Sequence, residues 1–79
     1  MNTYGTLDYS HGTGTWDLIA REGERITVKE GDCISLGYVM GKEVLAVLTK
    51  DMVGRWEWAV TPVDAKPRPG GTATIRRTA

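Results

Sequence analysis

The segment from Arg55 to Val60 constrains the fold of this chain more than any other. Its residues read Arg-Trp-Glu-Trp-Ala-Val, so that polar and apolar side chains alternate. A period of two places Trp56 and Trp58 on the same face of a half-buried β-strand. Two tryptophans on one face carry enough apolar area to anchor a core or to grip a partner. We therefore expect a small domain built from β-strands.

The turns on either side of the early strands predict their register. Residues 16–20 and 25–28 flank Arg21-Glu22-Gly23. A loop of these three residues pairs Leu18 with Ile26, apolar with apolar, and puts Gly23 at the left-handed position that closes such loops. Register follows the apolar pattern, so we favour this loop over the shorter Glu22-Gly23 alternative.

A second hairpin is predicted to join residues 34–40 to residues 43–49 through Gly41-Lys42. Glycine at the first position of a two-residue loop suits a type II′ turn. In this register Val39 pairs with Val44, and Ser35 pairs with Leu48. The opposite face then carries four apolar side chains, from Leu36, Tyr38, Leu45 and Val47.

The third hairpin joins residues 43–49 to the tryptophan strand through Met52-Val53-Gly54. This loop makes Asp51 face Arg55, an opposite-charge pair, and makes Leu48 face Trp58. A slip of one residue would instead put the tryptophans on the face of Tyr38, Leu45 and Val47. Residues 3–9 are a further candidate strand, and residues 10–14 read as a flexible loop.

These elements predict an all-β fold: a small antiparallel barrel or bent sheet of five to seven short strands. We expect residues 1–65 to form a single β domain. Residues 66–79 are expected to be a basic Pro/Gly linker followed by a tail or a short edge strand, because Lys66-Pro67-Arg68-Pro69 does not suit a central strand.

Composition limits which other features, such as disulfides, metals or cofactors, the domain can have. A chain of 79 residues buries only about 60–65% of its unfolded surface, so its stability is marginal. Cys33 and His11 are the sole cysteine and histidine, which exclude an internal disulfide and make a poor metal site. We expect no cofactor, no membrane segment and, from the free thiol and the absence of a signal peptide, a cytoplasmic location. Self-association into a homo-oligomer is the remaining way to stabilise the domain.

No catalytic constellation emerges from the residue types. Asp8, Ser10 and His11 match a hydrolase triad in kind, but residues so close in sequence do not normally reach triad geometry. No cation lies near Cys33 in sequence to activate its thiol, so a buried apolar role is favoured. Gly12-Thr13-Gly14 lacks the lysine of a phosphate loop. We therefore expect a protein that is not an enzyme.

The first third of the chain resembles the opening of an SH3 domain. The resemblance rests on Thr6-Leu7-Asp8-Tyr9, then Asp17-Leu18, then Glu22-Gly23-Glu24-Arg25-Ile26. It stops there, because the adjacent tryptophan pair of that family is split here as Trp56-Glu57-Trp58 and its Pro-x-x-Tyr motif is absent. SH3-type ligand binding is therefore assigned to no residue. An SH3-like barrel remains our topology prediction.

The most consistent function is a small binding module that acts through protein–protein contacts. The middle hairpin has more apolar surface than one small core can hide, and excess apolar surface marks an interface. The predicted partner-binding residues are Leu36, Tyr38, Leu45 and Val47, which would also support a homodimer. Size and the lack of active-site chemistry fit an accessory or inhibitor protein of a phage or mobile element.

The alternative is a nucleic-acid-binding β-barrel. The net charge is zero, but residues 64–79 carry four basic residues against Asp64 alone. In this interpretation tryptophans stack on bases and arginines hold phosphates. The residues concerned are Arg55, Trp56, Trp58, Arg68, Arg76 and Arg77. A third class, an oligomeric enzyme with His11 or tyrosines at a symmetric pore, has no substrate to test it on.

Overall fold

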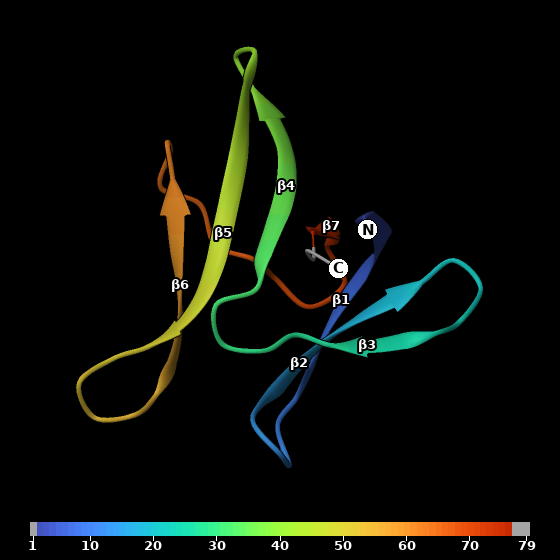
Figure 1. Ribbon diagram of the computed structural model, residues 1–79, viewed down its shortest axis with the longest axis vertical. Helices are drawn as coiled ribbons and strands as arrows, with labels where there is room; N and C mark the ends of the chain where they lie inside the picture. Colours follow the sequence, from blue (N-terminus) through green and yellow to red (C-terminus); the bar gives the residue numbers. More distant parts are fainter. Residues whose placement is uncertain (1, 77–79) are drawn as a thin grey trace.

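The computed structural model describes residues 2–76, which fold into one antiparallel sheet of seven strands, with no helix among them (Figure 1). The strands are β1 (Asn2–Ser10), β2 (Thr15–Ala20), β3 (Arg25–Thr27), β4 (Cys33–Val39), β5 (Lys42–Lys50), β6 (Trp56–Thr61) and β7 (Thr72–Arg76). Their order across the sheet is β3-β2-β1-β7-β4-β5-β6, so β3 and β6 form its edges. The all-β, bent-sheet prediction is confirmed, and the sheet is not closed. The SH3-like topology stays a prediction.

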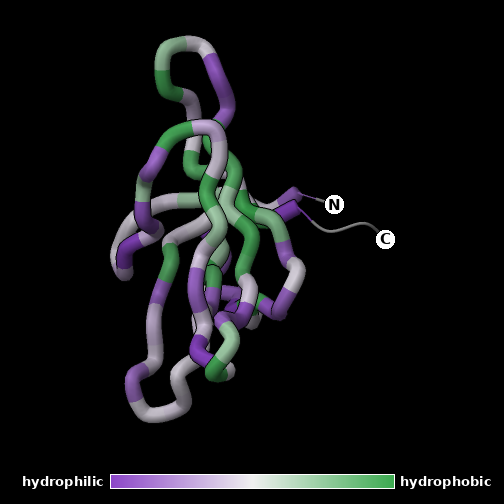
Figure 2. Tube along the Cα trace, turned by 90° about the vertical axis from the view of Figure 1, so that its left-hand side faces the viewer, coloured by the Kyte–Doolittle hydropathy of each residue, from purple (hydrophilic) through white to green (hydrophobic). Residues whose placement is uncertain are grey.

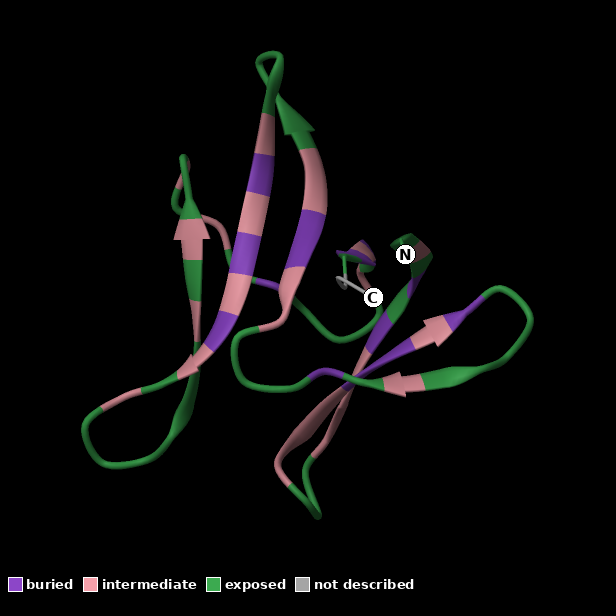
Figure 3. Ribbon diagram, in the orientation of Figure 1, coloured by how far each residue is buried: buried purple, intermediate pink, exposed green. Residues whose placement is uncertain are grey.

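The core lies on one face of the curved sheet. Apolar side chains from alternate positions of the strands meet there, and hydrophobic segments run through the middle of the molecule (Figure 2). Buried segments follow β1, β2, β4 and β5, whereas the hairpin tips are exposed (Figure 3). The buried cluster consists of Leu7, Leu18, Val28, Ile34, Ala46, Leu48, Ala73 and Ile75.

The first and third predicted hairpins are confirmed. Leu18 pairs with Ile26, and Gly23 has a φ of 91°, as the three-residue loop requires. Leu48 pairs with Trp58 in the third hairpin, so the tryptophan strand has the predicted register. In both cases the glycine ends the loop, and only a left-handed residue closes it without splaying the strands.

The predicted register of the second hairpin is wrong. The turn is Met40-Gly41, with φ values of 52° and 80°, and Val39 pairs with Lys42. Two left-handed residues make a type I′ turn, whose twist matches that of the strands. A β-bulge between Ser35 and Gly37 then inserts an extra residue into β4, so that Ser35 pairs with Leu45 rather than Leu48.

Strand β7 is also placed differently from the prediction of an edge strand or tail. It lies between β1 and β4 in the middle of the sheet, with Ala73 only 3% and Ile75 only 2% exposed. The apolar residues at positions 73 and 75 alternate with polar ones, which suits a strand with one buried face. Residues 62–71 cross behind β5 and β4 to reach this position (Figure 1).

Candidate functional site: an aromatic cleft

Side chains from both halves of the chain form one aromatic cluster. The ring centroid of Trp16, on β2, lies 5.0 Å from that of Tyr9 on β1. On its other side, the Trp16 centroid lies 5.5 Å from that of Trp58 on β6, at an interplanar angle of 77°. The Trp16–Trp58 contact is edge-to-face and the Tyr9–Trp16 contact is tilted, and ring pairs at these distances are favourable. The cluster therefore links the hairpin of β1 and β2 to the far edge strand.

This cluster lines a cleft, which we name the aromatic cleft. The cleft has a volume of about 480 Å³ and is lined by Tyr9, Gly14, Trp16, Arg55, Trp56 and Trp58. Four of the six aromatic residues of the chain thus line a single hollow. A volume of this size lies within the usual range of small-ligand sites.

Trp56 is the accessible member of the cleft. This residue is 39% exposed, and the Lys50 ammonium lies 4.5 Å from its ring centroid, a cation–π contact. Trp58 is more enclosed because it packs against the core. Its indole Nε1 is buried without a hydrogen-bond partner among the described residues. An unpaired buried donor costs free energy, so a carbonyl group brought to this atom would be stabilised.

Arg55 is held at the mouth of the cleft by Asp51. The Asp51 carboxylate accepts hydrogen bonds from the backbone N–H groups of Arg55, at 2.9 Å, and Val53, at 3.0 Å. It also accepts one from Nε of Arg55, at 3.2 Å. These donors, the Arg55 N–H first, lower the pKa of Asp51. The guanidinium of Arg55 is therefore already paired with a carboxylate.

The connection from β6 to β7 brings a proline to the same aromatic residues. Lys66 and Pro67 share a second hollow, of about 400 Å³, with Trp16, Trp58 and Glu57. Pro67 is buried there although it lies outside every strand. Trp16 and Trp58 thus already adjoin a proline-containing connection of their own chain.

The four predicted partner-binding residues do not share one surface. Leu36 packs against the core cluster, because the bulge in β4 turns it to that side. Leu45 and Val47 lie on the opposite face of the sheet, partly exposed. Tyr38 is 70% exposed and lines a different hollow, where Glu43 accepts a hydrogen bond from Ser35 and pairs with Arg76.

The predicted nucleic-acid residues are brought together only in part. Arg55, Trp56 and Trp58 line the aromatic cleft. Arg76 lies elsewhere, on the outer side of β7, where it is paired with Glu43. Arg68 is exposed in the connection before β7, and Arg77 lies outside the described residues.

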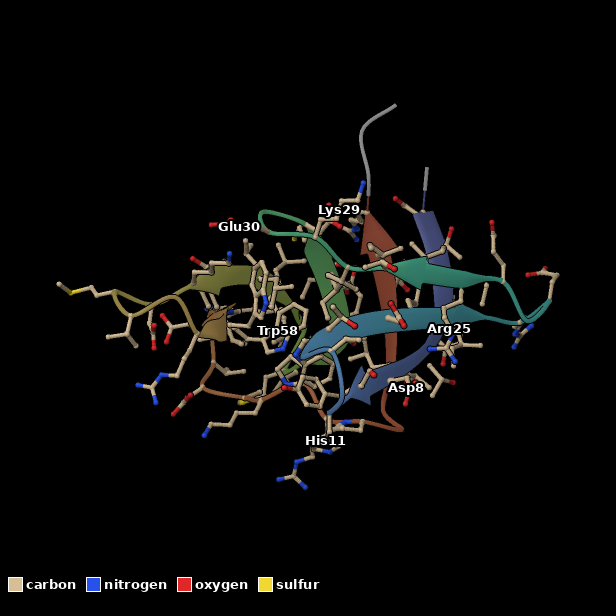
Figure 4. The ribbon with its side chains drawn as sticks, turned by 90° about the horizontal axis from the view of Figure 1, so that it is seen from below. Asp8, His11, Arg25, Lys29, Glu30 and Trp58 are labelled. Atoms are coloured by element: carbon tan, nitrogen blue, oxygen red, sulfur yellow. The ribbon has the colours of Figure 1, made fainter. Side chains whose placement is uncertain are left out.

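The residue types of a hydrolase triad are separated in space. Asp8 forms an ion pair with Arg25 at 3.1 Å, and Arg25 also pairs with the buried Asp17 at 2.9 Å. These two acids raise the pKa of Arg25, Asp17 most strongly. His11 packs against the ring of Tyr9, and Figure 4 shows it apart from Asp8 and Arg25. No cluster of His, Cys, Asp and Glu suited to a metal ion occurs within residues 2–76.

Tyr9, Gly14 and Trp16 are members of the cleft that sequence reasoning did not identify. Trp16 packs against the core cluster, and the Val28 N–H donates to the Trp16 carbonyl at 2.8 Å. The local sequence pattern does not indicate that the β1–β2 hairpin lies beside β6. This proximity depends on how β7, β4 and β5, which lie between β1 and β6 in the sheet, pair with one another. Only the alternation around Trp56 pointed to the site.

Comparison with known proteins adds no relative. No family model matches the chain, and neither the curated proteins nor the solved structures contain a match. Within the described part of the chain, no helix has the length and apolar character needed to cross a membrane.

Proposed function

We propose that the protein is a non-enzymatic binding module whose aromatic cleft holds an extended segment of a protein partner. One observation carries this proposal: four of the six aromatic residues line a single hollow at an open edge of the sheet. Tryptophan and tyrosine are the residues most enriched at the energetic centres of protein interfaces. This replaces the predicted surface on the middle hairpin, whose residues are divided between faces.

The chemistry of the cleft favours a peptide over a folded surface. A hollow of about 480 Å³ receives a few side chains rather than a flat face. Aromatic-lined grooves accept extended peptide segments, and pockets for their side chains give the specificity. Burial of Pro67 beside Trp16 and Trp58 is an internal example of such packing.

Charge argues against nucleic acid as the occupant. Arg55 is paired with Asp51, and Lys50 lies over Trp56 rather than beside an open phosphate site. Arg76 is engaged by Glu43 away from the cleft. Nucleic-acid affinity comes chiefly from several basic side chains along one surface, and the net charge here is zero.

Two further parts of the proposal concern the state of the protein in the cell. We place it in the cytoplasm, because Cys33 is a free thiol. A homodimer through Leu45 and Val47 is the second candidate contact, because both apolar side chains are partly exposed on the face opposite the core. A solution mass equal to one chain at micromolar concentration would contradict the dimer.

The cleft is tested by selecting binders from a library of random linear peptides. Selected peptides are expected to bind the wild-type protein and to lose about tenfold or more in affinity against Trp56→Ala. Tyr38→Ala is the matched control, because it removes an even more exposed aromatic ring, 70% against 39%, from outside the cleft. Fluorescence anisotropy of labelled peptides measures each affinity.

Two results would overturn the proposal. Peptides that bind Trp56→Ala as well as they bind wild type would place the contact elsewhere. Binding of an oligothymidylate that weakens steeply with salt and disappears in Trp56→Ala would favour the nucleic-acid alternative instead.

A further inference from the structure

We propose that the partner segment binds as an additional β-strand on the free edge of β6, with its backbone hydrogen-bonded to Trp56, Trp58 and Val60. This inference rests on the proposed function and specifies how the same site recognises its ligand. In strand addition the main chain supplies affinity, and pockets for alternate side chains supply specificity.

The hydrogen bonds of the third hairpin show which backbone groups of β6 point outward. The Asp51 N–H donates to the Arg55 carbonyl at 2.9 Å, so this pair is hydrogen-bonded. Bonded and non-bonded pairs alternate along an antiparallel ladder. Glu57, Ala59 and Thr61 therefore bond to β5, and the N–H and C=O groups of Trp56, Trp58 and Val60 face the open edge.

Strand β5 gives the same assignment independently. The Leu48 N–H donates to the Asp32 carbonyl at 3.2 Å, and the Leu48 carbonyl accepts from the Gly31 N–H at 2.8 Å. Both backbone groups of Leu48 thus point away from β6. Since Leu48 is the register partner of Trp58, the backbone of Trp58 must point away from β5.

The opposite edge of the sheet, strand β3, is less able to accept an additional strand. Strand β3 has only three residues, and the side chain of Arg25 ties it to Asp8 and Asp17. Short strands and charged side chains are common protections against unwanted pairing. Strand β6 has six residues, with no proline, lysine or bulge among them, and Glu57 is its only charged side chain. The two edges therefore differ in their capacity to accept a strand.

A single segment fits beside β6 better than the edge of a second copy. Tyr9, Gly14 and Trp16 of the β1–β2 hairpin line the cleft together with Trp56 and Trp58 of β6. The hollow that these residues line, of about 480 Å³, has the size of a site for a few side chains, which one strand beside β6 would supply. Alternate side chains of the segment would enter the cleft, so we expect apolar or aromatic residues at every second position of the partner.

Residue-resolved amide exchange by NMR tests the inference with a peptide from the selection described above. In the free protein the amides of Trp56, Trp58 and Val60 should exchange rapidly, while those of Glu57, Ala59 and Thr61 are protected. The peptide should slow exchange at the first three at least tenfold. Equal protection of Trp58 and Ala59 in the dilute free protein would show that the edge is already covered.

Backbone substitution separates strand addition from side-chain docking. Val60→Pro removes an outward N–H without touching the bonds to β5, whereas Val60→Thr keeps that N–H and the branched shape. We expect at least a tenfold loss of peptide affinity for Val60→Pro relative to Val60→Thr, with both variants folded by circular dichroism. N-methylation along the peptide should weaken binding at every second residue only.

The outcomes distinguish this inference from the function on which it rests. A peptide that depends on Trp56 but shows no alternation in the N-methyl scan, and binds both Val60 variants equally, overturns strand addition and leaves the cleft proposal standing. A peptide insensitive to Trp56 overturns both. Concentration-dependent protection of Trp58 without peptide would assign the edge to a second copy and would also overturn the inference.

Discussion

At the residue scale, Gly5 is required by the close approach of β1 and β2. A Cβ atom at this position would lie 2.3 Å from the carbonyl oxygen of Ile19, which is backbone and part of the ladder. The neighbouring strand cannot move away without breaking pairs such as Leu7 with Leu18 in the core. Glycine is thus the only residue that this crossing accommodates.

We predict that Gly5→Ala lowers the free energy of unfolding by about 1–3 kcal/mol, the usual cost of overpacking. Gly12→Ala is the control, because a Cβ there has no neighbour within 4 Å and the backbone is not left-handed. Chemical denaturation measures both. A Gly5→Ala protein as stable as Gly12→Ala would contradict the close approach.

Asp51 gives the hairpin before β6 a dependence on pH. Its pKa is lowered in the folded state, first by the Arg55 N–H and then by that of Val53. A carboxylate with a lowered folded pKa contributes stability that is complete above its unfolded pKa, about 3.9, and is lost as the pH falls through the folded value.

We therefore predict that Asp51→Ala is less stable than wild type at about pH 7 and that the difference shrinks below about pH 4. Denaturation of both proteins across this range measures the effect. Asp64→Ala, which changes an exposed acid outside the strands, should show no such trend. A difference between Asp51→Ala and wild type that stays constant down to about pH 2 would exclude the titration of Asp51 as its cause.

At the element scale, the hairpin of β4 and β5 shows why one register prediction failed while two succeeded. The loops ending in Gly23 and Gly54 carry their left-handed glycine where the sequence pattern indicates it. In the middle hairpin the first left-handed residue is Met40, a type that seldom adopts this conformation, so the pattern drew attention to Gly41-Lys42 instead. The bulge at Ser35 to Gly37 has no local sequence signal other than the glycine itself.

The left-handed Met40 predicts a stabilising substitution. Met40 is 96% exposed, so its side chain contributes little packing. Asparagine tolerates positive φ and gives the preferred Asn-Gly pair of a type I′ turn. We expect Met40→Asn to raise the free energy of unfolding by about 0.5–1 kcal/mol, seen as an increase of several degrees in Tm.

The matched control is Met52→Asn, at the tip of the next hairpin. Met52 is equally exposed, but its φ is not positive. This control should change the stability little. If the two variants gave the same Tm, the turn conformation of Met40 would not be the source of the effect.

At the scale of the whole molecule, the sequence predicts local features such as strands and turns, but not the pairing of segments that are distant along the chain. Strand positions follow from alternation and turn chemistry. The buried face of β5, which carries Val44, Ala46 and Leu48, does not, because residues 44–48 are all apolar. The central place of β7 and the meeting of Tyr9 with the tryptophans depend on pairings between distant segments. Single-sequence patterns contain no information on such partners, which is why half of the aromatic cleft was missed.

The insertion of β7 divides the sheet into halves that are each contiguous in sequence. Strands β1, β2 and β3 come from one stretch of chain and β4, β5 and β6 from the next, and each half pairs with the other only through β7. A chain released by the ribosome only as far as Thr61 therefore lacks the strand that hydrogen-bonds the two halves to each other. The complete sheet can form only after the five residues of β7, which is synthesised last among the strands, have become available for pairing.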